Sequence, residues 1–460
     1  MNLDAKQREA CRPVGSLQLE HATNSEPWWS GSDRRSAGNR RPPSLALRPS
    51  GPAAPAQDAL GPVGNRAEAL VLAVALYLVS LNRTVGENYL DYRYENYQED
   101  SGRIGVNTHA WLFEDKLVPW LSVKGLAVYD AISGATPTGG PTPNQAQSIM
   151  LNTLGYSAPG TPGDQVPLAQ MHDKRWAGSM DAILTLGPHR LTPEFSYSSE
   201  HDYLSYGAAL NYSVDLNAKN TTLNLGCAHD WDTVLPANSP FLYRTKHKDT
   251  DQLLVGVNQL LSPKTVLSAN FSFATARGYL SDPYRGVMFD ESDQYSLNNL
   301  ILYPEKRPGH RQSYVPEISL KQYLTPLHAA VEGSYRYYWD TYGIAAHTVE
   351  LAWRQKVWKV LQVSPVFRYY RQSAASFYAV HFPGDFVYDP AAIPANYSSD
   401  YRLSELETFS AGVELSARVR QWLTLDLSYK RYEMHGLDGI TSPSAYPKAN
   451  VVTIGARIWF

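Results

Sequence analysis

The sequence predicts an all-β protein, a single transmembrane antiparallel β-barrel of about sixteen strands with both termini in the periplasm. Three observations predict this fold class. Extended segments with an apolar residue at every second position recur from residue 87 onward, the connections between them alternate between short and long, and the chain ends on an alternating strand that finishes with Phe460. Such strands offer one face to lipid and the other to water.

The composition fits a barrel better than a bundle of membrane helices. The 460 residues carry a formal net charge of −3 and have a mean hydropathy of −0.36, which is too polar for membrane helices. The 31 Tyr and 11 Trp exceed the 12 Phe, and such polar-tipped aromatics collect where a membrane meets water. The near-neutral charge gives no reason to expect nucleic acid. Two cysteines, Cys11 and Cys227, provide neither a disulfide framework nor a metal site, so no cofactor is expected.

Residues 1–86 form a separate N-terminal region in this prediction, and residues 87–460 form the barrel. Positions 1–66 are rich in Pro, Arg, Ser, Gly and Ala without periodicity, which indicates disorder or absence from the mature protein. The apolar run at 69–81 has the length of a signal-peptide core. Because it lies far from Met1, the favoured hypothesis is a start site assigned too far upstream or a damaged export signal, and the alternative is a short buried segment.

The strands follow from the two-residue period. In the segment 203–215, for example, Leu204, Tyr206 and Leu210 share one face, while Ser205 and Asn211 lie on the other. The same pattern predicts strands near 88–99, 102–114, 118–131, 174–186, 189–200, 203–215, 219–231, 248–261, 264–277, 313–324, 327–339, 345–357, 360–372, 404–419, 422–434 and 450–460.

The connections carry independent information. Those that leave even-numbered strands are tight, at 187–188, 216–218, 262–263, 325–326 and 420–421. Those that leave odd-numbered strands include every long one, at 132–173, 232–247, 278–312, 373–403 and 435–449. A barrel with both termini in the periplasm has short periplasmic turns and long external loops, whereas a sandwich or a lipocalin-like fold has no reason for this parity.

The last strand places Ile454, Ile458 and Phe460 on its apolar face. An alternating strand that ends the chain on an aromatic residue resembles the C-terminal strand of bacterial outer-membrane barrels. The resemblance implies that this strand closes the barrel and is recognised by the barrel assembly machinery. The expected partners are therefore outer-membrane lipid and that machinery.

The opposite faces of the strands would line the lumen with acids and bases in mixture. One interpretation is an interior in which opposite charges neutralise one another and little channel stays open. The other is a solute pathway in which Arg336, Arg354, Arg368 and Arg457 form a basic ladder that selects anions. The first is slightly favoured because glutamates lie close to these arginines in strand position. The candidate lumen residues are Glu317, Lys321, Glu332, Arg336, Glu350, Arg354, Arg368, Glu414, Arg418, Asp426, Lys430 and Arg457.

Catalytic and metal sites are not expected. The His-Asp pairs at 172–173, 201–202 and 229–230 fall mostly at strand ends, where polar residues are common, and no hydrolase or phosphate-binding motif accompanies them. The acidic external segment 282–293 lacks regular ligand spacing, so solvated loop acids are the favoured interpretation.

Three tyrosine-rich patches, at 91–94, 335–340 and 367–378, are typical of an interfacial girdle at strand ends. The alternative is a stacking surface for a sugar or a redox ligand.

Several segments resemble the recurrent motifs of a bacterial family catalogued as domain of unknown function 3570. They lie at 130–135, 199–203, 278–285, 335–348 and 372–378, and the resemblance runs in order from about residue 89 to residue 460. It implies an exported outer-membrane β-barrel of Gram-negative bacteria. It implies no activity and no catalytic residues.

The expected function is that of a non-enzymatic outer-membrane protein, a narrow solute channel or porin-like protein that passes small solutes. The alternative is an accessory barrel of an envelope complex with a closed, charge-filled lumen. An outer-membrane hydrolase is the third candidate, and it would depend on His201 or His229.

Overall fold

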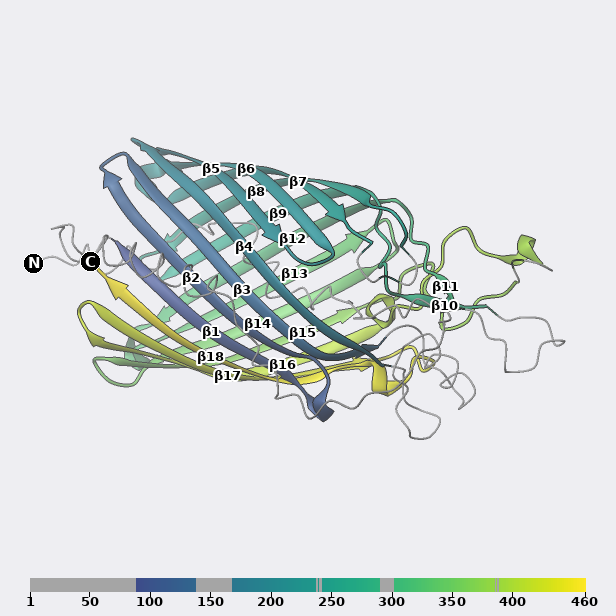
Figure 1. Cartoon of the computed structure of the whole chain (residues 1–460). Helices are drawn as coiled ribbons and strands as arrows, with labels where there is room; N and C mark the ends of the chain where they lie inside the picture. Colours follow the sequence, from purple (N-terminus) through teal and green to yellow (C-terminus); the bar gives the residue numbers. More distant parts are fainter. Residues whose placement is uncertain are drawn as a thin grey trace, which may run out of the picture. The chain divides into compact units, whose positions relative to one another are not determined.

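Sixteen antiparallel strands close into one barrel, as the alternating pattern predicts (Figure 1). The computed structural model describes residues 88–137, 168–236, 239, 242–289, 302–384, 386 and 389–460, all within the compact unit Gly31–Phe460. The predicted N-terminal region 1–86 lies outside the described residues. The wall strands are β1 (Tyr89–Glu99), β2 (Gly105–Val118), β3 (Leu121–Pro137), β4 (Leu168–Leu186), β5 (His189–Ser199), β6 (Tyr203–Leu216), β7 (Thr221–Val234), β8 (Lys246–Ser262), β9 (Thr265–Gly278), β12 (His310–Leu324), β13 (Ala329–Asp340), β14 (Ala345–Lys356), β15 (Leu361–Gln372), β16 (Leu406–Arg420), β17 (Leu423–Gly436) and β18 (Lys448–Trp459).

The predicted strand limits differ most from the structure in β3 and β4. β3 continues to Pro137 rather than 131, and β4 begins at Leu168 rather than 174. The ladder continues through these ends, since Pro137 pairs with Leu168, but the side chains there no longer alternate between apolar and polar. Backbone pairing needs no apolar period once a strand has left the lipid, so the sequence pattern ends before the strand does.

Short elements complete the described part of the chain. β10 (Gly286–Met288) and β11 (Leu302–Pro304) form a separate two-stranded sheet inside a segment predicted as a loop. Three residues are too few to produce a recognisable period. Single 3-10 turns occur at Asp100–Gly102, Asn217–Lys219, Thr325–Leu327, Pro390–Ala392, Tyr401–Leu403 and Pro443–Ala445. No described helix is both long and apolar enough to span a membrane.

The predicted parity of the connections is present in the barrel. At one end, adjacent strands are joined by short turns, such as Pro119-Trp120, Gly187-Pro188 and Gln421-Trp422. Gly187 has φ of +64°, which suits the first central position of a tight hairpin turn with twist matched to its strands. All the long connections, after β3, β7, β9, β15 and β17, lie at the opposite end, which we call the loop end.

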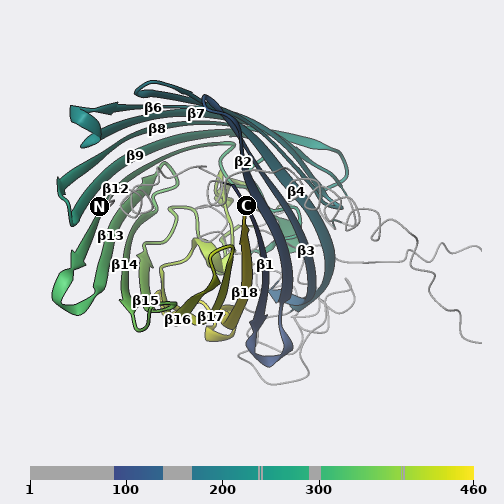
Figure 2. The same ribbon diagram turned by 90° about the vertical axis from the view of Figure 1, so that its left-hand side faces the viewer.

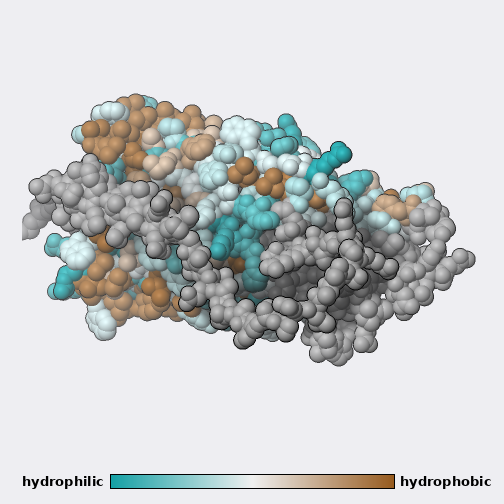
Figure 3. Space-filling view, viewed as in Figure 1, coloured by the Kyte–Doolittle hydropathy of each residue, from teal (hydrophilic) through white to brown (hydrophobic). Residues whose placement is uncertain are grey.

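The two faces of the wall differ in chemistry. Phe195, Leu253, Leu427 and Ile454 are among many large apolar side chains that the outer face leaves exposed. Figure 3 shows apolar residues gathered over the part of the visible wall nearer the short turns, with polar residues toward the loop end. An outward apolar band above a row of tight turns is the surface that a barrel presents to a bilayer.

The last strand closes the barrel. β18 pairs with β17 on one side and with β1 on the other, in a register that runs from Tyr89 opposite Trp459 to Glu99 opposite Ala449. Ile454 is exposed on the outer face, Ile458 shares that face by alternation, and Phe460 exchanges backbone hydrogen bonds with Asn88 at 2.9 and 3.3 Å. The two ends of the described chain therefore meet at the short-turn end.

We expect Leu427→Arg to destabilise the folded barrel in lipid vesicles by about 2–4 kcal/mol, because a guanidinium near the middle of the lipid-facing band must leave water. Leu427 lies on the outer face with 46% of its surface exposed. The measurement is reversible unfolding in denaturant. Ser428→Arg is the matched control, since Ser428 faces inward opposite Glu414 and a new arginine there stays hydrated. Equal destabilisation by both variants would contradict the assignment of faces.

Candidate functional site

Charged side chains form one connected chain on the inner face from β12 to β17. Lys321 Nζ lies 3.8 Å from Glu332 Oε1, and Arg354 Nε lies 3.1 Å from Glu332 Oε2. Arg354 Nη1 also lies 3.7 Å from Glu414 Oε2, and Lys430 Nζ lies 3.0 Å from Glu414 Oε1. Two glutamates are thus shared among three cations.

Strand register explains how this chain spans six strands with charged residues from five of them. Lys321 and Glu332 are direct cross-strand partners in β12 and β13. Arg354 comes from β14, and Glu414 comes from β16, so the intervening strand β15 must leave a gap between them. It does so at Ser364, the register partner of Glu414, whose side chain is small and buried.

A second group lies further along the same inner face. Arg368 Nη1 is 3.3 Å from Glu350 Oε1, and these two residues are cross-strand partners in β14 and β15. Arg336 of β13 stands opposite Glu317 of β12 in the register. Each of these two arginines therefore has a carboxylate on the neighbouring strand.

The closing seam between β1 and β18 carries a third group. Arg457 donates from Nε to Asp91 Oδ2 at 2.8 Å, and Arg93 lies 3.4 Å from the same carboxylate. Gly455 stands between β1 and β17, where a Cβ would meet Asp426 Cβ at 3.4 Å and Arg93 Cγ at 3.6 Å. The missing side chain lets Asp426 and Arg93 face each other across β18.

The four arginines of the proposed basic ladder therefore do not stand alone. Each of them has an acid on an adjacent or nearby strand: Arg336, Arg354, Arg368 and Arg457. This is the arrangement expected of an interior in which opposite charges neutralise one another. Arg418 stays outside these groups, because its Nη2 donates to the Gln421 carbonyl at a short turn, at 3.0 Å.

A buried ion cluster that the sequence reasoning missed lies at the loop end. We call the described residues 279–289, 302–309, 373–384 and 389–405 the mouth cap. Arg307 donates to Glu305 at 3.1 Å and to Asp400 at 2.8 Å, and all three side chains are almost fully buried. Arg402 bridges Asp400 at 2.5 Å and Asp282 at 2.9 Å. The cluster thus ties the connection after β9 to the connection after β15.

The arginines decide the ionisation of this cluster. Burial acts to raise the pKa of Asp400, but Arg402, Arg285 and Arg307 outweigh it and hold that pKa well below its usual range. The pKa of Asp282 is lowered in the same way, against burial, by Arg285 and Arg402. Stability from such carboxylates is present above the pKa of the unfolded chain and is lost only as the pH falls through the lowered folded value.

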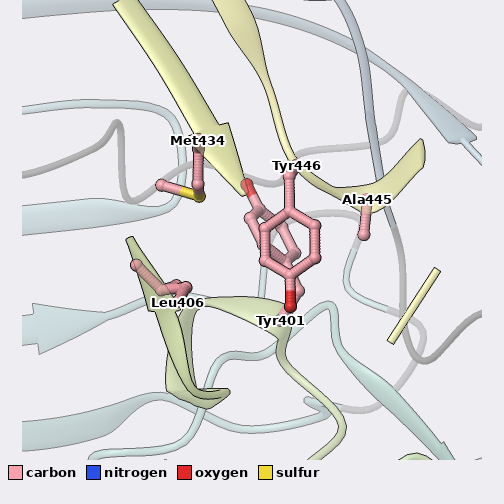
Figure 4. Packing of buried hydrophobic residues seen from close by; sticks show 5 residues of the cluster. All are labelled: Tyr401, Leu406, Met434, Ala445 and Tyr446. Atoms are coloured by element: carbon pink, nitrogen blue, oxygen red, sulfur yellow. The ribbon is translucent and has the colours of Figure 1, made fainter. Parts of the chain in front are cut away.

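Small apolar clusters surround the ion pairs of the mouth cap. Val287 and Phe289 pack with Phe382 and Tyr397, which again joins the two connections. A second cluster places Tyr401 beside Leu406, Met434, Ala445 and Tyr446, with the Tyr401 and Tyr446 rings edge to face at 87° (Figure 4). Viewed from the short-turn end, part of the connection after β15 lies inside the outline of the wall (Figure 2).

Four of the five motifs that resemble the known family meet at this cap. Asp282 and Tyr284 come from the motif at 278–285, and the Tyr284 hydroxyl donates to Asp202 of the motif at 199–203, at 2.6 Å. Phe377 of the motif at 372–378 packs with Tyr342 between the two halves of the motif at 335–348. Asp282 was predicted as a solvated loop acid, which is wrong because its carboxylate is buried between arginines.

The neighbouring histidines and aspartates do not pair with each other as catalytic dyads. His229 Nδ1 lies 2.7 Å from Asp251 on the adjacent strand, whereas Asp230 accepts a hydrogen bond from Gln252 at 2.9 Å. Asp202 binds Tyr284 rather than His201. Of the acidic segment 282–293, residues 290–293 lie outside the described residues.

The tyrosine-rich patches divide between the two faces of the wall. Tyr335 and Trp339 are exposed on the outer face, where Tyr335 bonds His347 at 2.8 Å, while Tyr338 turns inward and donates to Asp340 at 2.6 Å. At the short turns, Trp120 is exposed as well. Outward aromatics near both ends of the strands have the arrangement of interfacial girdles.

A family model described as "Protein of unknown function (DUF3570)" matches residues 67–443, in agreement with the resemblance of the motifs. No curated protein matches the chain. Among solved structures, a bacterial polysaccharide outer membrane secretin aligns over 82% of this chain and 100% of its own, with 8% identity and a TM-score of 0.42. OmpT of Vibrio cholerae with loop L8 deleted aligns over 82% and 99%, with 10% identity and a TM-score of 0.38. CdiB from Acinetobacter baumannii aligns over 82% and 61%, with 8% identity and a TM-score of 0.43. These likenesses concern the barrel fold alone.

We expect Asp400→Asn to loosen the mouth cap and leave the wall intact. Removing one carboxylate from a buried ion cluster leaves Arg307 and Arg402 undercompensated, at a cost of about 3–5 kcal/mol. Hydrogen exchange and limited proteolysis of the folded protein in detergent should both be faster in residues 389–405. The matched control is Asp389→Asn, an exposed acid of the same connection. Identical protection in Asp400→Asn and the native protein would contradict this account of the cap.

Proposed function

Since this chain belongs to the DUF3570 family of outer-membrane-type β-barrel proteins, which brings no established activity, we propose a function from the geometry. The protein is a narrow channel for small hydrophilic solutes in the outer membrane of a Gram-negative bacterium. The mouth cap restricts its external opening, and paired charges line its lumen.

One observation carries this proposal, the contrast in exposure between the charges of the wall and those of the cap. On the inner wall, Lys321 keeps 51% and Glu350 keeps 48% of its side-chain surface exposed. In the cap, the side chains of Arg307 and Asp400 keep only 2% and 0%. Hydrated charges on the wall support a wet interior, and dry ion pairs in the cap support a restricted mouth.

The fold supports the placement in the membrane. Short turns and both ends of the described chain share one end of the barrel, which in bacterial barrels is the periplasmic end, and the cap then faces outward. In this placement the outer apolar band meets lipid, and β18 is the strand that the barrel assembly machinery recognises.

The pairing of the lumen charges sets the kind of solute. Arg354 and Lys430 share Glu414, so neither sign dominates that part of the wall. Such a lining favours small polar or zwitterionic solutes over one class of ion. The long side chains that reach inward from several strands narrow the path and exclude large solutes.

A closed accessory barrel of an envelope complex is the second candidate, and a different observation favours it. On the inner face of β1, β4 and β5, Asp91, Asp181 and Glu194 are buried, with 2%, 6% and 8% of their surface exposed. Burial of inward acids is expected where the lumen is filled. This candidate predicts no conductance and a partner protein that co-purifies with the barrel.

A non-enzymatic role is part of the proposal. His229 does have an acid at Nδ1, Asp251, but this pair lies on the outer face of the wall and not in the lumen, and Asp202 is held by Tyr284 and not by His201. A hydrolase would lose turnover when His201 or His229 is replaced.

We expect the purified barrel to give small, stepwise conductance in planar bilayers. The double variant Glu332→Gln with Glu414→Gln should shift ion selectivity toward anions, because Arg354 and Lys430 lose their counter-charges. A unit charge at about 4 Å in water is worth about 1 kcal/mol, so the chloride-to-potassium permeability ratio should rise about fivefold.

The control for this experiment is Ile454→Val, a conservative change on the outer face. It should leave both conductance and selectivity as they are in the native barrel. Absence of any conductance from correctly folded protein would overturn the channel and favour the accessory barrel.

A further inference from the structure

Three carboxylates converge where the wall meets the mouth cap. Asp173 comes from β4, and Glu200 and Asp202 come from the connection between β5 and β6. One oxygen from each of the three lies within 4.8 Å of the other two. The residues come from two segments, and the fold brings these three carboxylates to this distance.

Two oxygens of this group are buried without a hydrogen bond. Asp202 is only 6% exposed, its Oδ2 accepts the hydrogen bond of the Tyr284 hydroxyl at 2.6 Å, and its Oδ1 has no partner among the described residues. Glu200 Oε2 is likewise buried and without a partner there. A buried carboxylate oxygen with no donor is costly, so its presence indicates a missing ligand.

The positive charge of the nearby Arg175 does not replace this missing ligand. Arg175 donates to Asp130 at 2.6 Å from Nε and pairs with it at 2.5 Å from Nη2. The three carboxylates therefore lie close together, and the guanidinium nearby is already engaged by Asp130.

We propose that Asp173, Glu200 and Asp202 bind a calcium ion. The donors are all oxygens, which hard divalent cations prefer. Magnesium gives up its waters reluctantly and is seldom held by an all-protein set of ligands, whereas calcium accepts flexible sets of protein oxygens, so this group of carboxylates favours calcium. The three oxygens lie within 4.8 Å of one another, close enough for one cation to contact all three.

The ion would brace the cap against the wall. Tyr284 belongs to the connection after β9, and its hydroxyl orients the ligand Asp202. The Ser239 hydroxyl donates to the Pro283 carbonyl beside it, which adds the connection after β7 to the same junction. The inference does not depend on the proposed channel, because a closed barrel would hold the ion equally well.

The test uses the full-length folded protein in detergent with terbium as the probe. Terbium takes the place of calcium in oxygen sites and luminesces when a nearby tyrosine absorbs light, and Tyr284 lies one hydrogen bond from the site. We expect a saturable signal that calcium displaces and that magnesium displaces only at higher concentration. Absence of a saturable signal, or displacement by magnesium at lower concentration than calcium, would overturn the proposal.

Two variants and a matched control locate the ion. Asp202→Asn and Glu200→Gln should each abolish the saturable signal, and Asp100→Asn, an exposed acid at the same end of the barrel, should leave it unchanged. Tyr284→Phe, which also removes the tyrosine that sensitises terbium, should weaken calcium binding about tenfold in calorimetry, because outer partners of metal ligands commonly contribute that much. The folding of each variant is checked by its heat-dependent migration on gels. If Asp202→Asn does not fold, Glu200→Gln alone tests the assignment of the ligands. Native-like binding in both ligand variants would overturn the assignment.

Discussion

Closure of the backbone ladder between β1 and β18 is the constraint on which the rest of the structure depends. In hydrocarbon an unpaired N–H or C=O has no water to bind, so a sheet that spans a bilayer cannot keep an open edge. Here the seam pairs every residue of β1 from Tyr89 to Glu99 with β18. Once the seam is closed, an even number of antiparallel strands follows, the two ends meet on one side, and the turns must alternate between the two ends.

Closure also sends every second side chain into a confined space, where charges must find partners. In the wall, one acid is shared between two cations, and small residues leave room for charges on non-adjacent strands to approach each other. Ser364 leaves room for Arg354 to reach Glu414 over one strand, and Gly455 leaves room between Asp426 and Arg93 over another. A long side chain at either position would stand between the charges, so the small residues are part of the geometry of the charge network.

The sequence predicts the wall well and the mouth cap poorly, for one physical reason. Lipid imposes a two-residue period on every strand, so sixteen strands and the connection parity can be read from apolar alternation, as in 203–215. The sequence contains no comparable pattern for strand register or cross-strand pairing. The sharing of Glu414 by Arg354 and Lys430 therefore could not be predicted from it. Outside the membrane there is no period at all. Arg307 and Asp400 lie 93 positions apart, and only the family-like motifs at 278–285 and 372–378 marked this region in advance.

The mouth cap is therefore stabilised by interactions of a different kind from those of the wall. Its own stability comes from ion pairs and small aromatic clusters, and side-chain hydrogen bonds join it to the wall, such as Tyr342 to the Pro308 carbonyl at 2.8 Å and Tyr284 to Asp202 at 2.6 Å. The wall is held by continuous backbone ladders, whose opening in lipid is far more costly than the loss of a few side-chain contacts. Cap and wall can therefore differ in stability, and the mouth can rearrange while every strand stays paired.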